Sequence, residues 1–212
     1  MVSRFQTLVL FVTSLVFILS LILLPFFRAT ENSEPMLRNM ADQTYSLASR
    51  IKLNNGLTMP RIHLGVYLMS NKEASSAVGH ALDAGYRGFD SAQMYHNEKD
   101  VGNSILSYLK SHSDLKREDI HYTSKLASNS DYDTVRRSIT KSVKECGLGY
   151  IDLFLLHSPY GGKQKRLESW RAVEDAVKDG EVRIGGVSNF GVKHVSASIA
   201  TRTNRTHSVA DR

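Results

Sequence analysis

The chain has 212 residues, of which 42% are hydrophobic and 23% charged, and this composition excludes a disordered, collagen-like or coiled-coil protein. Its net charge of +6 arises from 27 Lys and Arg against 21 Asp and Glu, mixed along the sequence, so we expect no nucleic-acid partner, which would need positive charge concentrated on one face. A single cysteine, Cys146, excludes an internal disulfide and cysteine-rich zinc motifs, and we predict no metal site.

The first element along the chain is an apolar run at residues 8–27 that contains no charged residue. At about 1.5 Å per residue, a helix of this length spans about 30 Å, the thickness of the hydrocarbon core of a bilayer. Residues 1–27 are therefore predicted to form a single-pass transmembrane anchor that places the protein in a membrane. A cleaved signal peptide is the alternative, although no Ala-x-Ala site follows the run. Arginines on both sides leave the orientation undetermined.

The segments after this run predict a linker and then a repeating unit. Residues 28–50 have no apolar periodicity and are predicted to be a linker. Asn55-Gly56, between short apolar runs, predicts a hairpin with a two-residue turn. Apolar runs of strand length then alternate with stretches of helical period, such as the one between Asp131 or Asp133 and Gly147. The five strands are expected at residues 62–68, 87–90, 121–126, 152–157 and 183–187.

Strands that alternate with helices predict an α/β fold with a parallel sheet, either an open doubly wound sheet or a (β/α)8 TIM-type barrel. No Gly-rich phosphate-binding turn follows the first predicted strand, which favours the barrel. A closed barrel takes about 250 residues. We therefore predict an incomplete barrel of about five parallel strands over residues 51–195, followed by an irregular tail at 196–212.

Polar, reactive side chains stand at the ends of four consecutive predicted strands. Asp90, Lys125 and His157 end the second, third and fourth strands, and Ser188-Asn189 follow the fifth. Tyr95 comes five residues after Asp90. Because neighbouring parallel strands lie about 4.8 Å apart, these groups are expected to gather at one edge of the sheet. An acid, a phenol, an amine and an imidazole gathered in this way indicate a catalytic site.

Four segments carry a resemblance to a known family. They are residues 89–102, which read FDSAxxYxNExxxG at the quoted positions, then TSKL at 123–126, DLxLLHSP at 152–159 and IGGVSNF at 184–190. In this order and spacing they resemble the successive signatures of the aldo-keto reductases. The resemblance runs from about residue 51 to residue 195. The resemblance implies a (β/α)8 barrel that reduces a small-molecule aldehyde or ketone to an alcohol with NADPH.

The resemblance also implies roles for individual residues. Tyr95 would be the proton donor, Lys125 and Asp90 its electrostatic support, and His157 the group that orients the substrate carbonyl. Asp90, Ser188 and Asn189 would contact the cofactor, with Ser188 and Asn189 on the nicotinamide carboxamide. Tyr67 is a candidate for the substrate pocket, and a core tyrosine is the equally weighted alternative. His63 stands where the family usually has a glycine.

The chemistry is consistent with these roles. Hydride transfer to a carbonyl carbon builds negative charge on the oxygen, which a positioned acid must protonate. An ammonium group within hydrogen-bond reach stabilises the phenolate that a tyrosine acid leaves behind. The missing strands would weaken cofactor binding, so two alternatives to a reductase stay open. One is a non-catalytic membrane-anchored remnant or interaction protein, and the other is a truncated product without stable function.

Overall fold

The computed structural model describes residues 45–53 and 55–199, and all of these except Tyr45 belong to one compact unit that begins at Ser46. The unit opens with a hairpin of β1 (Arg50–Lys52) and antiparallel β2 (Thr58–Pro60), in which Ile51 lies opposite Met59. The predicted hairpin is confirmed, but its turn is longer than two residues. Leu53 donates its backbone N–H to the carbonyl of Leu57, and Gly56 between them adopts a positive φ of 86° that a side chain would disfavour.

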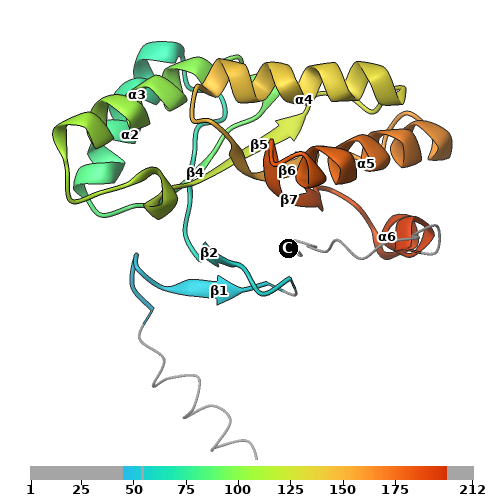
Figure 1. The fold of residues 1–212 in the computed structure, drawn as a ribbon, viewed down its shortest axis with the longest axis horizontal. Coiled ribbons are helices and arrows are strands. Elements are labelled where there is room, and N and C mark those ends of the chain that lie inside the picture. The colour runs from blue at the N-terminus through green and yellow to red at the C-terminus, as the bar shows by residue number, and fades with distance from the viewer. Residues whose placement is uncertain (1–44, 54, 200–212) are drawn as a thin grey trace, which may run out of the picture. The chain divides into compact units, whose positions relative to one another are not determined.

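The main sheet has five parallel strands that follow one another in chain order (Figure 1). They are β3 (Leu64–Gly65), β4 (Gly88–Asp90), β5 (His121–Leu126), β6 (Ile151–Leu156) and β7 (Val182–Val187). The predicted α/β class and the five parallel strands are confirmed. A doubly wound sheet reverses its strand order partway, and the five described strands do not, so the described sheet has the order of a barrel segment.

The first of these strands is much shorter than predicted. The sequence predicts a strand at residues 62–68, whereas β3 covers two residues. Val66 still donates its N–H to the carbonyl of Asp90 at 3.1 Å, but Met69 then turns back to the carbonyl of Val66 and Leu68 adopts a left-handed φ of 63°. The backbone has therefore left the extended conformation before the apolar run ends.

Helices connect successive strands and cover one face of the sheet. Each of the four connecting helices contacts the next one along the chain, which places all of them on the same side (Figure 1). They are α2 (Asn71–Asp83), α3 (Glu98–Ser111), α4 (Tyr132–Cys146) and α5 (Lys163–Lys178), and α6 (Val192–Ile199) follows β7. The predicted boundaries of α4 are confirmed at both ends. Asp131 caps its first turn by accepting from the N–H of Thr134, and Gly147 ends it with a positive φ.

The central strands β5 and β6 bury both of their faces. Phe89, Tyr122 and Phe154 point toward the helices and are fully buried in the larger apolar cluster. Side chains alternate along a strand, so Leu153 and Leu155 point to the opposite face, where they form a second cluster with Ile184 and with two hairpin residues, Leu53 and Met59. Lys125 lies opposite Leu155 in the register and therefore shares this second face.

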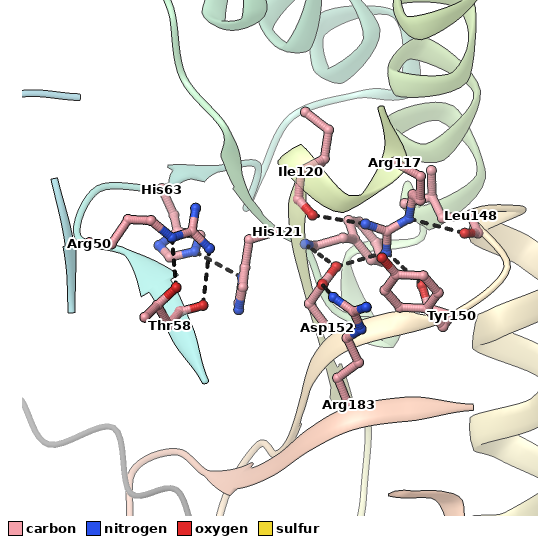
Figure 2. Close-up of polar contacts among 11 residues, drawn as sticks. Arg50, Thr58, His63, Arg117, Ile120, His121, Leu148, Tyr150, Asp152 and Arg183 are labelled. Atoms are coloured by element: carbon pink, nitrogen blue, oxygen red, sulfur yellow. Dashed lines mark hydrogen bonds and ion pairs between the residues drawn. The ribbon is translucent and has the colours of Figure 1, made fainter. Parts of the chain in front are cut away.

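Two polar clusters lie near the amino ends of the strands (Figure 2). Arg117, from the short 3-10 turn η2 (Arg117–Asp119), pairs with the buried Asp152 at 2.7 Å and donates to the carbonyls of Ile120, Leu148 and Tyr150. In the other cluster, Nε2 of His63 lies 3.2 Å from Nδ1 of His121. The ring of His63 covers Gly88, where a Cβ atom would be 2.3 Å from the imidazole.

The predicted membrane localisation is corrected. Across residues 45–199, apart from residue 54, no helix combines the length and the apolar character needed to cross a bilayer. Residues 8–27, on which the prediction depended, lie outside the described residues, as does most of the predicted linker. The single-pass membrane localisation and the membrane partner are therefore not retained. At the other end, α6 includes residues 196–199, the start of the predicted irregular tail, and residues 200–212 lie outside the described residues.

Candidate active site

The predicted site residues lie at the carboxyl ends of the strands. Asp90 is the last residue of β4, Lys125 is the last but one of β5, and His157 directly follows β6. Ser188 and Asn189 directly follow β7. Parallel pairing of β4, β5, β6 and β7 aligns these ends along one edge. The apolar strands are fixed by the core, and the polar residues that follow them are thereby held in adjacent positions.

Lys125 is the centre of the cluster. Its ammonium group forms an ion pair with the carboxylate of Asp90, and it donates to the carbonyl of Ser91 at 2.9 Å and to the phenol oxygen of Tyr95 at 3.3 Å. The residue is only 6% exposed. A buried ammonium is costly unless it is paired and hydrogen-bonded, and these three contacts satisfy its three donors. The charge is therefore fixed beside the phenol.

Tyr95 is carried by a short 3-10 turn, η1 (Gln93–Tyr95), in the loop after β4. Its ring lies close to two other rings, with centroid separations of 4.9 Å to Tyr67 and 5.8 Å to His157. Tyr67 is 63% exposed, so the alternative of a core tyrosine is wrong. The structure thus places an exposed aromatic ring and an imidazole next to the phenol.

His157 is half-buried, and burial lowers the pKa of its imidazole, with a further lowering by the positive charge of Lys125. The ring is therefore neutral at neutral pH, and one of its nitrogens carries a hydrogen that can be donated. Nδ1 is buried and has no hydrogen-bond partner among the described residues. A neutral imidazole beside the phenol can donate a hydrogen bond to the oxygen of a bound molecule. Because it carries no positive charge, it does not compete with Lys125 for the carboxylate of Asp90.

Ser188 and Asn189 lie beside His157. The amide nitrogen of Asn189 donates to the carbonyl of His157 at 2.9 Å and lies 3.1 Å from Oγ of Ser188. Asn189 has a positive φ of 61°, a conformation that asparagine tolerates better than most residues. Its amide oxygen has no partner among the described residues. This oxygen can accept a hydrogen bond and the Ser188 hydroxyl can donate one, and a carboxamide group needs both an acceptor and a donor.

Sequence reasoning did not assign three residues that shape the site. Ser91 contributes a carbonyl to Lys125 and its hydroxyl to Oδ1 of Asn97 at 2.8 Å. The buried amide of Asn97 donates in turn to the carbonyls of Val66 and Met69. The side chain of Gln93 connects the loop to the segment after β5 and to α4. All three lie within residues 89–102, where Gln93 stands at an unspecified position of the motif. The motif alone does not tell which of these residues make hydrogen bonds that hold the loop.

No three His, Cys, Asp or Glu side chains in the described part of the chain gather as a metal site. What the cluster offers is an acidic hydroxyl supported by a fixed cation, next to a neutral imidazole. Such an arrangement can protonate an oxygen on which negative charge develops.

Comparison with known proteins finds oxidoreductases and aldo-keto reductases among the relatives of this chain. An uncharacterised oxidoreductase of Schizosaccharomyces pombe is 52% identical over 149 residues, 70% of this chain and 53% of that protein. Glyoxal reductase of Bacillus subtilis is 41% identical over 152 residues, 71% of this chain and 52% of the enzyme. The crystal structure of a Bombyx mori aldo-keto reductase in complex with NADP aligns with a TM-score of 0.69 at 32% identity, over 76% of this chain and 57% of that one.

The chain spans about half the length of the curated relatives it matches. The model of the Aldo/keto reductase family matches residues 61–210, which extends beyond residue 195, the end of the resemblance seen in the sequence motifs. The match covers the whole main sheet and the strand ends that form the site. The chain therefore belongs to the aldo/keto reductase family.

Proposed function

We propose that the protein is an oxidoreductase that reduces a small aldehyde or ketone to an alcohol with NADPH as the reductant. The observation that carries the proposal is the buried ammonium of Lys125, which contacts both the carboxylate of Asp90 and the phenol oxygen of Tyr95. Relatives named glyoxal reductase and methylglyoxal reductase support the substrate class, because both names denote small dicarbonyl compounds.

In this proposal Tyr95 is the proton donor. Reduction of a carbonyl carbon leaves negative charge on its oxygen, and the Tyr95 hydroxyl protonates that oxygen as the charge forms. The ammonium of Lys125 donates to the Tyr95 oxygen at 3.3 Å, so it stabilises the phenolate that remains. Asp90 and the Ser91 carbonyl hold the ammonium in place, which keeps this support available without reorganisation.

His157 orients the substrate oxygen in this proposal. Its lowered pKa keeps the imidazole neutral, so it donates a single hydrogen bond and adds no second positive charge next to Lys125. The exposed ring of Tyr67 packs against that of Tyr95, and we assign Tyr67 to the wall of the substrate site. Together the two rings limit the directions from which a carbonyl oxygen reaches the Tyr95 hydroxyl.

The residues present fit a nicotinamide cofactor at the edge of the site. Ser188 and Asn189 offer a hydroxyl donor and an amide oxygen to the carboxamide, and Asp90 ends β4 at the same edge of the sheet. A reduced nicotinamide bound there supplies the hydride. The NADP-bound Bombyx mori structure, which is similar in fold and sequence, supports this choice of cofactor.

The test compares the 212-residue chain with its Tyr95→Phe variant in NADPH-dependent reduction of methylglyoxal. Phenylalanine keeps the ring and removes the acid, so we expect the rate to fall by about a hundredfold or more. Tyr108→Phe is the matched control, because Tyr108 lies on α3, where its ring stacks on His112. Equal rates for Tyr95→Phe and the unmodified chain, or no reduction of any small carbonyl by either protein, would contradict the proposal.

A further inference from the structure

The turn that carries Tyr95 has little stability of its own. η1 is a single 3-10 turn, closed by the backbone bond from Tyr95 to Ala92 at 2.9 Å and ended by His96 in the left-handed region. One isolated turn does not hold a fixed position in water, because its few hydrogen bonds do not offset the conformational entropy. The position of the Tyr95 hydroxyl therefore depends on what holds this turn against the rest of the fold.

The amide of Gln93, the first residue of the turn, provides such contacts. Its Oε1 accepts from the backbone N–H of Ala127 at 2.8 Å. Its Nε2 lies 2.7 Å from Oγ of Ser138, 3.2 Å from the Ser138 carbonyl and 2.9 Å from Oγ of Ser142. A backbone N–H can only donate, so the amide oxygen must face Ala127 and the nitrogen must face α4. One side chain thus contacts the segment after β5 with its oxygen and α4 with its nitrogen.

The two residues joined by the first of these bonds are close in sequence to the proposed proton donor and its cation. Gln93 stands two residues before Tyr95, and Ala127 stands two residues after Lys125 and directly follows β5. The bond between them therefore links the segment that carries the phenol to the segment that carries the ammonium. These are the groups whose oxygen and nitrogen lie 3.3 Å apart.

A second connection reinforces the far end of the same loop. The buried carboxyl of Glu98, at the start of α3, accepts from the Ser124 hydroxyl at 2.5 Å and from the Ser142 hydroxyl at 3.3 Å. Ser142 therefore contacts both Gln93 and Glu98, and Ser124 precedes Lys125 on β5. The loop that carries Tyr95 is held at both ends by contacts that meet on β5 and α4.

We propose that Gln93 is a positioning residue that holds the Tyr95 hydroxyl at hydrogen-bonding distance from Lys125. It acts through the backbone of η1 and contacts neither Tyr95 nor Lys125 through its side chain. This inference rests on the proposed function, since it assigns Gln93 a purpose only if Tyr95 is the proton donor. A misplacement of about 1 Å at a reacting group costs about a hundredfold in rate, so loss of this support is expected to be measurable.

The experiment reads the position of Tyr95 without relying on activity. The full chain is labelled with carbon-13 in its tyrosine rings, and the Tyr95 resonance is assigned by its loss in Tyr95→Phe. In Gln93→Met, which keeps the length of the side chain and removes its hydrogen bonds, we expect the Tyr95 resonance to shift and broaden. Gln164→Met, on α5, where the amide contacts only Glu168 in the same helix, is the matched control.

Several outcomes would overturn the inference. An unchanged Tyr95 resonance in Gln93→Met would show that Gln93 contributes only to stability. Rapid hydrogen exchange of the Ala127 amide in the unmodified chain would also refute it, and this measurement does not require any variant to fold. With methylglyoxal and NADPH, Gln93→Met should lower kcat by about tenfold to a hundredfold with little change in the KM for NADPH. Tyr95-dependent reduction that is indifferent to Gln93→Met would refute the inference and leave the proposed function intact.

Discussion

Acidification is expected to destabilise the fold through the paired histidines near the amino ends of the strands. His121 is 3% exposed, and burial, together with the facing His63 and the positive charges of Arg50, Arg117 and Arg183, lowers its pKa to about 3. Burial also lowers the pKa of His63, against a partial increase from Asp90. Both rings are therefore neutral in the folded state at neutral pH, where they share the hydrogen bond of 3.2 Å.

The sign and the size follow from proton linkage. Between pH 6.5 and about 3 the unfolded chain binds a proton at residue 121 and the folded chain does not, so stability falls as the pH falls. The full effect, reached below about pH 3, is about 5 kcal/mol at about 1.36 kcal/mol per pKa unit. At pH 5 the same relation gives a loss of about 2 kcal/mol relative to pH 7.5. With a urea slope of about 2 kcal/mol per molar, the unfolding midpoint should fall by about 1 M.

The assay is urea unfolding at pH 7.5 and pH 5, followed by the fluorescence of Trp170, the single tryptophan and a largely buried one. The control is His121→Asn, whose side-chain amide places a hydrogen-bonding atom near the position of Nδ1 and does not titrate. This variant is expected to lose about 2 kcal/mol less than the unmodified chain over the same pH range. Titration of other groups, including Glu98, whose pKa burial raises, is common to both proteins and cancels in the comparison. Equal pH-dependent losses in the two proteins would refute the reasoning.

Two further changes test the helix packing and capping. Gly102→Ala should destabilise the fold by about 3 kcal/mol or more, since its Cβ would lie 1.8 Å from the backbone oxygen of Cys146. Gly79→Ala is the matched change in open space on α2, and it should stabilise the fold by about 0.5 to 1 kcal/mol because alanine favours a helix over glycine. Thermal unfolding measures both, and similar melting temperatures for the two variants would count against the α3–α4 contact. Asp131→Ala should cost about 1 kcal/mol by removing the cap of α4, while Asp131→Asn should cost little, and urea midpoints that rank the two in the opposite order would contradict this account.

Local patterns in the sequence were enough to predict the class of the fold and the neighbourhood of the site. Apolar runs of strand length alternate with helical periods, and this predicted parallel strands with connecting helices because both patterns depend on residues a few positions apart. Polar residues directly after apolar strands predicted that Asp90, Lys125 and His157 would share an edge, because parallel strands end on the same side. The turn residue Gly147 and the cap Asp131 were readable for the same local reason.

Contacts between distant residues were decided only by the tertiary structure. His63 and His121 are separated by 58 positions, and Gln93 and Ala127 by 34, so no local period reports either hydrogen bond. The length of β3 was also misjudged, because the apolar run at residues 62–68 does not show where the backbone turns: Tyr67 and Leu68 are exposed, and Leu68 has a left-handed φ. The predicted membrane localisation was also wrong. Hydropathy shows only whether a segment could enter a bilayer, and no helix in the described part of the chain is long and apolar enough to cross one. Which polar atoms meet in the folded chain depends on how strands and helices pack, and packing is a property of the whole fold.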